Sequence, residues 1–315
     1  MLVSVVVPVY NEEGNIEPLA ASLAACLPES CERELIFVDD GSKDKSLPIL
    51  RSLARKDPSI RYISFSRNFG HQTALRAGIE AARGDCVVMM DGDFQHPPSL
   101  MPALISEYEK GVDIVTTKRI QDHTTFLKRT TSNIFYFLVN ALSDTKIEPG
   151  SADFRLLSRR ARDVIVSMKE QGLFLRGAIP WTGLPSAEIQ YVPGSRRSGA
   201  SKFTASKMFS LALDGITSFS VKPLRLTSFA GVAISGAGFL YALYALIVRI
   251  FTDRTVEGWT SLLISVLLIG GIQLLSLGII GEYLGKLFME AKGRPPYIVK
   301  EASSPTGPNE RKKPL

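Results

Sequence analysis

The sequence predicts an α/β domain built around a largely parallel sheet, followed by a hairpin of two transmembrane helices. Over the first two hundred residues, short apolar segments rich in β-branched residues alternate with segments suited to helices, which is the pattern of such a domain. Further along, residues 226–248 and 258–281 carry no charged side chain. As a helix, each stretch is long enough to cross a hydrocarbon core about 30 Å thick.

The elements of the α/β domain follow one another regularly. The segments with the composition of buried strands are 2–9, 34–38, 60–65, 86–90 and 114–117. The segments suited to helices are 16–26, 47–56, 73–83 and 99–110. Strands separated in this way pair in parallel, with helices on both faces of the sheet.

Polar residues follow three of these strands. The first strand leads into Pro8 to Glu12, the second into Asp39 to Ser42, and the fourth into Asp91-Gly92-Asp93. In parallel sheets ligands bind at the carboxyl ends of the strands. The three clusters are therefore expected to form a single site.

The stretch VVMMDGDFQHPP places two carboxylates directly after a core strand. Residues i and i+2 of an extended chain point to the same side, so Asp91 and Asp93 can converge, and their repulsion favours a cation between them. With Gln95 they make an all-oxygen set that suits Mg²⁺ or Mn²⁺ shared with a phosphorylated substrate. An ordinary Asp-Gly turn is the alternative.

Basic residues flank the two apolar stretches unevenly. Lysine or arginine stands at 202, 207, 222 and 225 before the first and at 286, 292, 294 and 300 after the second, but only at 249 and 254 between them. The positive-inside rule then predicts an integral protein of the inner (plasma) membrane with both termini in the cytoplasm. The alternative is a soluble protein with two buried helices.

Charge and cysteine usage limit the possible partners. The net charge of +6 suits an anionic membrane and phosphate-bearing ligands, but it is too dispersed to indicate nucleic-acid binding. The three cysteines lack metal-ligand spacing and are expected to be reduced thiols.

The predicted boundaries divide the chain into four parts. Residues 1–204 form the α/β domain, 205–224 an interfacial amphipathic helix, 225–285 the transmembrane hairpin, and 286–315 a cytoplasmic tail. The polar, proline-containing end of the tail is expected to be disordered.

Six segments resemble the motifs of a known family. In chain order they are SVVVPVYNEE, FVDDGSKDKS, SRNFGHQTAL, MMDGDFQHPP, SADFRLLSR and RRSGASKF. Together they resemble the inverting family 2 glycosyltransferases that act on polyprenyl phosphates, such as dolichol-phosphate mannose synthases and bactoprenol glucosyltransferases. The two spans favour the bacterial branch. The resemblance implies a Rossmann-like, nucleotide-sugar-binding domain of the GT-A type.

The resemblance also implies roles for the residues of these motifs. Those that would border the nucleotide sugar are Pro8, Tyr10, Glu12, Asp40, Asp91, Arg196, Ser201 and Lys202. Asp91, Asp93 and Gln95 would hold Mg²⁺ or Mn²⁺, which neutralises charge that grows on the departing nucleoside diphosphate. A solvated basic loop is the alternative for Arg196 and its neighbours.

Asp153 and Asp93 are the residues that the resemblance places at the reaction itself. Asp153 resembles the usual catalytic base, but a phosphate monoester has a second pKa of about 6 and needs little help to lose a proton. Asp153 would then orient the sugar or stabilise positive charge at its anomeric carbon. Candidates for binding the acceptor phosphate are Arg129, Arg155 and Arg176, with structural salt bridges as the alternative.

The function expected from this resemblance is metal-dependent transfer of a hexose, by preference from UDP-glucose, to undecaprenyl phosphate at the cytoplasmic membrane face, with inversion. GDP-mannose and a UDP-aminopentose stay open as donors, and a homo-oligomer is compatible with the glycine-rich spans. A processive polysaccharide synthase is less favoured, because the chain lacks a Gln-x-x-Arg-Trp motif and has few spans for an export channel. A non-catalytic flippase subunit is the remotest alternative, since an intact Asp-x-Asp would have no purpose there.

Overall fold

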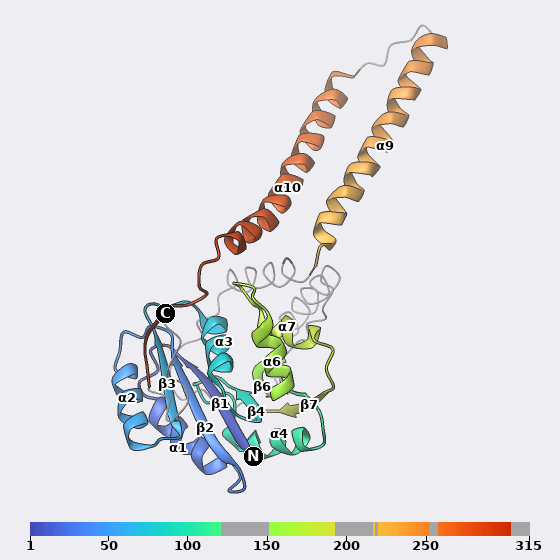
Figure 1. The fold of residues 1–315 in the computed structure, drawn as a ribbon. Coiled ribbons are helices and arrows are strands. Elements are labelled where there is room, and N and C mark those ends of the chain that lie inside the picture. Colours follow the sequence, from blue (N-terminus) through green and yellow to red (C-terminus); the bar gives the residue numbers. More distant parts are fainter. Residues whose placement is uncertain (121–150, 193–216, 218–219, 252–257, 304–315) are drawn as a thin grey trace.

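The computed structural model describes residues 1–120, 151–192, 217, 220–251 and 258–303. An α/β domain carries a hairpin of two long helices that projects away from it (Figure 1). Most of the predicted interfacial helix, 205–224, and the end of the tail, 304–315, lie outside the described residues.

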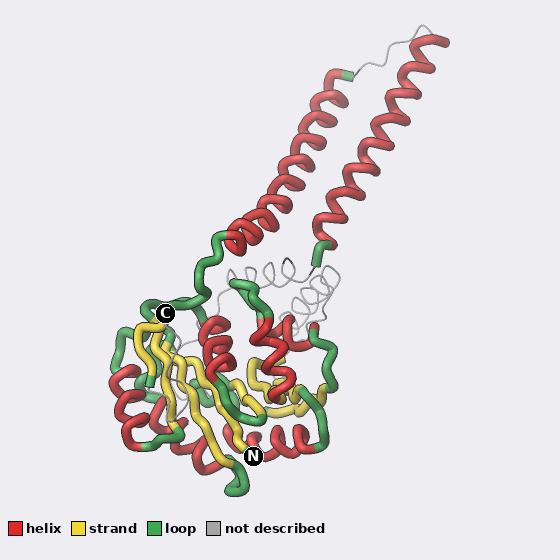
Figure 2. The backbone as a smooth tube through the Cα atoms, viewed as in Figure 1, coloured by secondary structure: helices red, strands yellow, loops and turns green. Residues whose placement is uncertain are grey.

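One eight-stranded sheet runs through the described part of the domain (Figure 2). Its strands are β1 (Leu2–Val9), β2 (Glu32–Asp39), β3 (Ile60–Phe65), β4 (Cys86–Met89), β5 (Ile114–Arg119), β6 (Ser151–Ser158), β7 (Ser186–Tyr191) and β8 (Val299–Ala302). Their order in the sheet is β7-β5-β6-β4-β1-β2-β3-β8. The five predicted strands are confirmed, with shifts of at most two residues at their ends.

The prediction of a largely parallel sheet is confirmed, since six of the eight strands in the described sheet run in the same direction and two, β6 and β8, run against them. β1 pairs in parallel with β2 and β4, β2 with β3, and β5 with β7. β6 lies antiparallel between β4 and β5, and β8 is antiparallel to β3 at one edge. β6 was not predicted because the charged residues Asp153 and Arg155 alternate with its apolar residues. Those apolar residues are buried, as the core-facing side of a strand requires.

Helices cover both faces of the sheet, as predicted. They are α1 (Ile16–Cys26), α2 (Ser46–Lys56), α3 (His71–Ala81), α4 (Met101–Glu109), α6 (Arg159–Ser167) and α7 (Leu175–Trp181), with a 3₁₀ turn at Pro98–Leu100. The core on one face contains side chains of α1, α2 and α4, and the core on the other those of α3, α6 and α7. β1 contributes to both, since Val5 and Val7 face the first core and Val6 the second.

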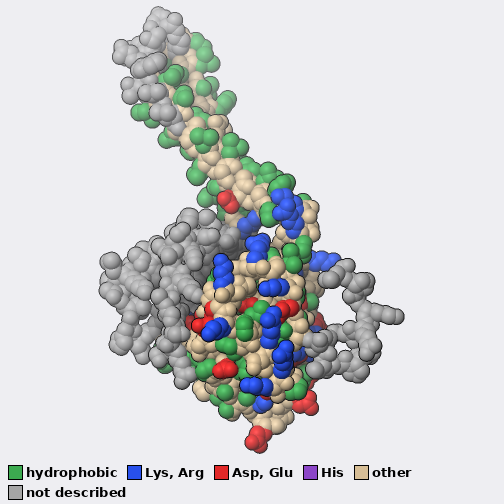
Figure 3. Space-filling view, turned by 90° about the vertical axis from the view of Figure 1, so that its left-hand side faces the viewer, with side chains coloured by type: hydrophobic (Ala, Val, Ile, Leu, Met, Phe, Trp, Pro, Cys, Tyr) green, Lys and Arg blue, Asp and Glu red, His purple; other side chains and the backbone are tan. Residues whose placement is uncertain are grey.

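The hairpin consists of α9 (Lys222–Phe251) and α10 (Trp259–Ala291). Its segments Lys222–Val248 and Ile264–Ala291 are long and apolar enough to cross a membrane, with mean hydropathies of 1.9 and 2.2. Their apolar windows are not buried against the domain, and Figure 3 shows hydrophobic side chains along the hairpin. Helices that are apolar and uncovered favour association with a membrane over a soluble core.

The chain returns to the domain after α10, which corrects the prediction of a simple tail over 286–315. Residues 299–302 pair with β3, and the ring of Tyr297 stacks on Phe65 with a centroid distance of 4.9 Å. The Tyr297 hydroxyl donates a hydrogen bond to Glu80 (2.6 Å). β8 was not predicted because it has only four residues, two of them charged, and depends on β3 for its hydrogen bonds.

Candidate active site

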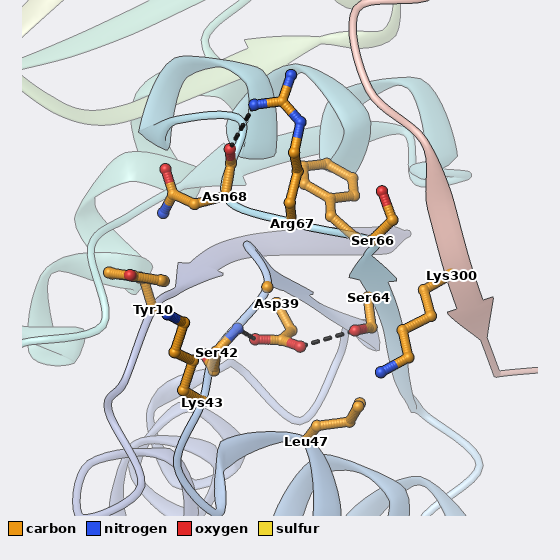
Figure 4. A pocket seen from close by; sticks show the side chains of 12 residues that line it. Tyr10, Asp39, Ser42, Lys43, Leu47, Ser64, Ser66, Arg67, Asn68 and Lys300 are labelled. Atoms are coloured by element: carbon orange, nitrogen blue, oxygen red, sulfur yellow. Dashed lines mark hydrogen bonds between the residues drawn. The ribbon is translucent and has the colours of Figure 1, made fainter.

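A pocket of about 430 Å³ lies at the carboxyl ends of β2 and β3 (Figure 4). Its lining includes Tyr10 after β1, Asp39 at the end of β2, Ser64 in β3, Arg67 after β3, and Lys300 in β8. We call it the β2–β3 pocket. The sheet edge predicted for ligand binding therefore holds a cavity, lined mainly by polar side chains.

Asp39, rather than the predicted Asp40, is the carboxylate of this pocket. Asp39 accepts hydrogen bonds from the Ser64 hydroxyl (2.7 Å) and from the N–H of Ser42 (3.0 Å). Asp40 is buried and accepts the N–H groups of Phe69 (2.6 Å) and Gly70 (3.0 Å). Asp40 thus anchors the chain that enters α3, and its predicted contact with the nucleoside stays a prediction.

Gly41 allows the two loops of the pocket to approach each other. Its φ is +70°, and a Cβ there would lie 2.5 Å from the carbonyl carbon of Arg67. Any larger residue would strain its own backbone and displace the loop after β3. The position requires glycine because the loops after β2 and β3 touch there.

Of the three predicted residues at the end of β1 and in the loop after it, one lines the pocket and two do not. Tyr10 lines the pocket, whereas Pro8 is buried in β1. Glu12 accepts a hydrogen bond from the side-chain amide of Asn15 (2.7 Å) at the start of α1. In this structure Glu12 orders the first loop and does not line the pocket.

Asp91 and Asp93 belong to a turn, not to an extended chain as predicted, because β4 ends at Met89. Phe94 has a φ of +62°, an unusual conformation for a bulky residue that is often found in functional loops. Asp93 accepts the N–H of Gln95 (3.1 Å). Buried His96 accepts the N–H of Asp91 through Nδ1 (3.0 Å), so the turn is fixed from within the protein.

His71 links the two carboxylates that the sequence placed in different motifs. Its Nε2 lies 2.8 Å from Asp91 Oδ1, and its Nδ1 lies 3.9 Å from Asp153 Oδ2. Burial raises the pKa of Asp91, but the hydrogen bond from His71 and nearby positive charge lower it more. The net pKa lies well below the usual range, so Asp91 is ionised at neutral pH.

Asp153 is held by a bidentate ion pair. Arg176 in α7 donates from Nε to Oδ1 (2.8 Å) and from Nη2 to Oδ2 (2.9 Å), and Gln72 adds a hydrogen bond of 3.3 Å. Burial raises the pKa of Asp153, but Arg176 and then His71 lower it below its ordinary value. A carboxylate so stabilised is a weak base, which favours an orienting or electrostatic role. We call Asp91, His71, Asp153 and Arg176 the charged cluster.

The three predicted acceptor arginines have different surroundings. Arg155 is 2% exposed and donates from Nε to the carbonyl of Ala152 (3.0 Å), and burial lowers its pKa to about 10. Its burial supports the structural alternative. The side chain of Arg176 is 28% exposed and faces both Asp153 and solvent. Arg129 lies outside the described residues, as do Arg196, Ser201 and Lys202 of the predicted basic loop.

The residues of the turn fit a divalent cation that is shared with a ligand. Asp91 and Asp93 offer hard oxygen donors, and at least Asp91 is ionised. Among the described residues, no group of three or more His, Cys, Asp and Glu side chains could hold a metal by itself. Mg²⁺ and Mn²⁺ suit such a site, since substrate phosphates and water can complete their coordination.

Sequence reasoning missed two residues of the site, His71 and Asp39 as a pocket residue. A usable signal was the polar run Ser66–Asn68 after β3, the one strand end among β1 to β4 that was not included among the clusters. His71 begins α3 just beyond that run. Including the end of β3 with the other three strand ends would have placed His71 in the predicted site, because all four ends lie at the same edge of the sheet.

Comparison with known proteins decides the family. Residues 4–165 match the model of glycosyl transferase family 2. The chain belongs to glycosyl transferase family 2. Residues 222–287 match the model of the GtrB C-terminal hairpin, which covers α9 and most of α10. The protein is thus a glycosyltransferase with a GT-A type sheet and a GtrB-type hairpin.

Similar proteins cover nearly the whole chain. The uncharacterized glycosyltransferase YkcC of Bacillus subtilis is 44% identical over 95% of this chain and 93% of its own. The SfII prophage-derived bactoprenol glucosyl transferase of Shigella flexneri is 40% identical over 96% of this chain and 98% of its own. A solved structure of glucosyl-3-phosphoglycerate synthase from Mycobacterium tuberculosis aligns with a TM-score of 0.45 and 21% identity, covering 69% of this chain and 77% of that chain.

Proposed function

We propose that this family 2 glycosyltransferase transfers glucose from UDP-glucose to undecaprenyl phosphate at the cytoplasmic face of the membrane, with inversion. The observation that carries the proposal is the presence, in one chain, of an ionised carboxylate cluster at the sheet edge and an uncovered apolar hairpin of the GtrB type. The name of the Shigella flexneri relative, a bactoprenol glucosyl transferase, supports the choice of acceptor and sugar.

The donor would extend along the carboxyl ends of the strands. Its nucleoside would occupy the β2–β3 pocket, where Asp39 can accept a hydrogen bond from a base N–H or a ribose hydroxyl. Asp91 and Asp93, with Gln95 beside them, would hold Mg²⁺ or Mn²⁺, which neutralises charge on the departing diphosphate. The protein supplies the position of these groups, since the turn is fixed by its own hydrogen bonds.

The transfer is a single displacement. An oxygen of the acceptor phosphate forms a bond to the anomeric carbon while the bond from that carbon to the diphosphate oxygen breaks, and the electron pair leaves with UDP. Inversion follows because no enzyme nucleophile intervenes. Near neutrality the acceptor is mostly a dianion. Asp153, fixed by Arg176, would orient the sugar and stabilise positive charge at the anomeric carbon.

The hairpin brings the enzyme to its lipid. A polyprenyl chain stays in the bilayer, because each CH₂ that leaves it costs about 0.8 kcal/mol. Lys222 and Arg225 at the start of α9 and Lys286 and Lys292 near the end of α10 lie at the end of the hairpin that joins the domain. These residues favour a cytoplasmic position for the α/β domain at an anionic membrane surface.

The test uses the full-length protein in detergent with undecaprenyl phosphate and Mn²⁺ or Mg²⁺. UDP-glucose, UDP-galactose, UDP-N-acetylglucosamine and GDP-mannose are offered separately, and the glycolipid is detected by mass spectrometry. We expect a product from UDP-glucose that is lost when a chelator is added. A product from another donor alone would refute the proposed sugar, and no product from any donor would refute the proposed reaction.

A further inference from the structure

The β2–β3 pocket contains one residue from the far end of the chain. Eleven of its twelve lining residues lie between Tyr10 and Asn68, and the twelfth is Lys300 in β8. This lysine follows the hairpin, so the chain passes through α9 and α10 before it supplies the residue. The predicted site contained nothing from this region.

A β-bulge determines where Lys300 points. Ser64 pairs with Glu301, and the next residue, Phe65, pairs with Val299, so Lys300 is the extra residue of β8. Bulges re-aim side chains and occur often beside active sites. In Figure 4 the side chain of Lys300 extends from β8 toward Ser64 and Leu47 on the wall of the pocket.

Contacts on both sides of Lys300 hold β8 in place. Arg51 forms a bidentate ion pair with Glu301, with distances of 2.7 and 2.5 Å. The Ser303 N–H donates to the carbonyl of Tyr62 (2.9 Å), and the Ser66 N–H donates to the carbonyl of Ile298 (2.9 Å). The lysine is therefore presented by an ordered strand.

We propose that Lys300 binds the nucleoside part of the donor, so that the strand after the hairpin completes the nucleotide site. The inference rests on the proposed nucleotide-sugar function. Lys300 is exposed and forms no hydrogen bond or salt bridge within the described residues, although its charge attracts the neighbouring Glu301 carboxylate, and Asp39 in the same pocket is a hydrogen-bond acceptor. An acceptor and a donor in one pocket suit a base edge in which an N–H stands beside a carbonyl, as in uracil.

The position of β8 in the sheet assigns Lys300 to the nucleoside rather than to the diphosphate. The order β4-β1-β2-β3-β8 places β8 four strand spacings from β4, whose end carries Asp91 and Asp93. At about 4.8 Å per spacing, the separation is roughly 19 Å. A lysine side chain cannot span that distance. The alternative is that Lys300 only protects the edge of the sheet from pairing with other strands.

Calorimetry with UDP and with UMP separates these roles, using full-length protein in detergent with Mn²⁺. We expect Lys300→Ala to lower the affinity for both nucleotides by about fivefold to tenfold, and Lys300→Arg to recover most of the lost affinity. Tenfold corresponds to about 1.4 kcal/mol. The matched control is Lys56→Ala, because Lys56 is an exposed lysine of α2 that does not line the pocket.

Two results would overturn the inference. Affinities of Lys300→Ala within twofold of wild type would make Lys300 an edge residue only, and a loss for UDP without a loss for UMP would move its contact to the diphosphate. The proposed function fails separately, if the wild type binds UDP but forms no glucolipid. If the wild type prefers GDP, the same variants are measured with GDP and GMP, and binding of neither nucleotide overturns both proposals.

Discussion

The β2–β3 pocket and the charged cluster share one edge of the sheet but are built in different ways. The pocket is formed mainly by the chain around the ends of β1, β2 and β3, with Lys300 of β8 added, and its carboxylate, Asp39, accepts hydrogen bonds from a hydroxyl and a backbone N–H. In the cluster, Asp91 and Asp153 are tied to His71 and Arg176 from α3 and α7. A pocket carboxylate held by neutral donors can exchange them for the donors of a ligand, whereas the charges of the cluster hold one another in place.

This difference predicts that changes in the cluster act on the reaction and on stability, and that changes in the pocket act on donor affinity. The largest effect is expected from Asp91→Asn combined with Asp93→Asn. Removing both carboxylates removes the cation site, so the initial rate of glucolipid formation should fall by at least about 10²-fold. Asp163→Asn is the matched control, since Asp163 is an exposed acid on α6. A doubly substituted protein that is folded and fully active would show that the assigned turn does not serve the reaction.

Arg176→Ala should have the next largest effect, on stability as well as on rate. It leaves the buried Asp153 charge without its bidentate partner, which should lower the free energy of unfolding by about 3 kcal/mol. Thermal unfolding in detergent measures the change. Arg160→Ala is the control, because Arg160 is exposed and its contact with Asp113 is long, at 3.5 Å. Equal melting temperatures for the two variants would contradict the distinction between cluster and surface.

The ion pair between Asp153 and Arg176 also predicts how stability depends on pH. The pKa of Asp153 is lower in the folded protein than its ordinary value of 3.8, because of Arg176 and His71. Ionised Asp153 therefore stabilises the fold above about pH 4, and this stabilisation is lost as the pH falls through the folded pKa. In Arg176→Ala the dependence of the melting temperature on pH below about 4 should be weaker than in wild type. An unchanged profile would mean that another group controls acid unfolding.

Substituting the adjacent aspartates of β2 tests the pocket. Asp39→Asn should raise the KM for UDP-glucose about tenfold, or ~1.4 kcal/mol, while the KM for the lipid stays unchanged. Asp40→Asn should instead lower stability by about 1–3 kcal/mol, since an amide oxygen replaces the carboxylate that accepts two N–H groups. Steady-state kinetics and thermal unfolding of both variants decide the assignment, and the reverse pattern would return Asp40 to the pocket.

The smallest effect is expected from Glu301→Gln, which weakens the ion pair between β8 and α2. Both side chains are partly exposed, so the loss in stability should not exceed about 1 kcal/mol. UDP affinity should fall by twofold or less, because backbone hydrogen bonds still hold β8. A larger loss of affinity would show that the position of Lys300 depends on this ion pair.

Much of the architecture was predictable, because local patterns determine it. β1 to β5 and α1 to α4 follow from runs of apolar residues and their periodicity, and α9 and α10 from long uncharged stretches. The location of the site follows from the rule that ligands bind at the carboxyl ends of parallel strands. The Asp-x-Asp turn and Asp153 were found by resemblance to family motifs.

Other features depend on contacts between distant parts of the chain. β6 and β8 are strands only because β4, β5 and β3 supply their hydrogen-bond partners. The choice between Asp39 and Asp40 depends on where the loop after β3 passes, and the role of His71 depends on α3 beginning beside the turn after β4.

The sequence by itself determined the class of domain, the hairpin and the edge of the sheet where chemistry takes place, since apolar periodicity and motif order act locally. Only the tertiary structure decided which carboxylate faces the pocket, that His71 joins Asp91 to Asp153, and that Lys300 reaches the pocket from beyond the hairpin. The physical reason is that hydrogen bonds and ion pairs act over about 3 Å in space. Separation along the chain, 29 residues from Asp40 to Phe69 and 250 from Arg51 to Glu301, does not limit them.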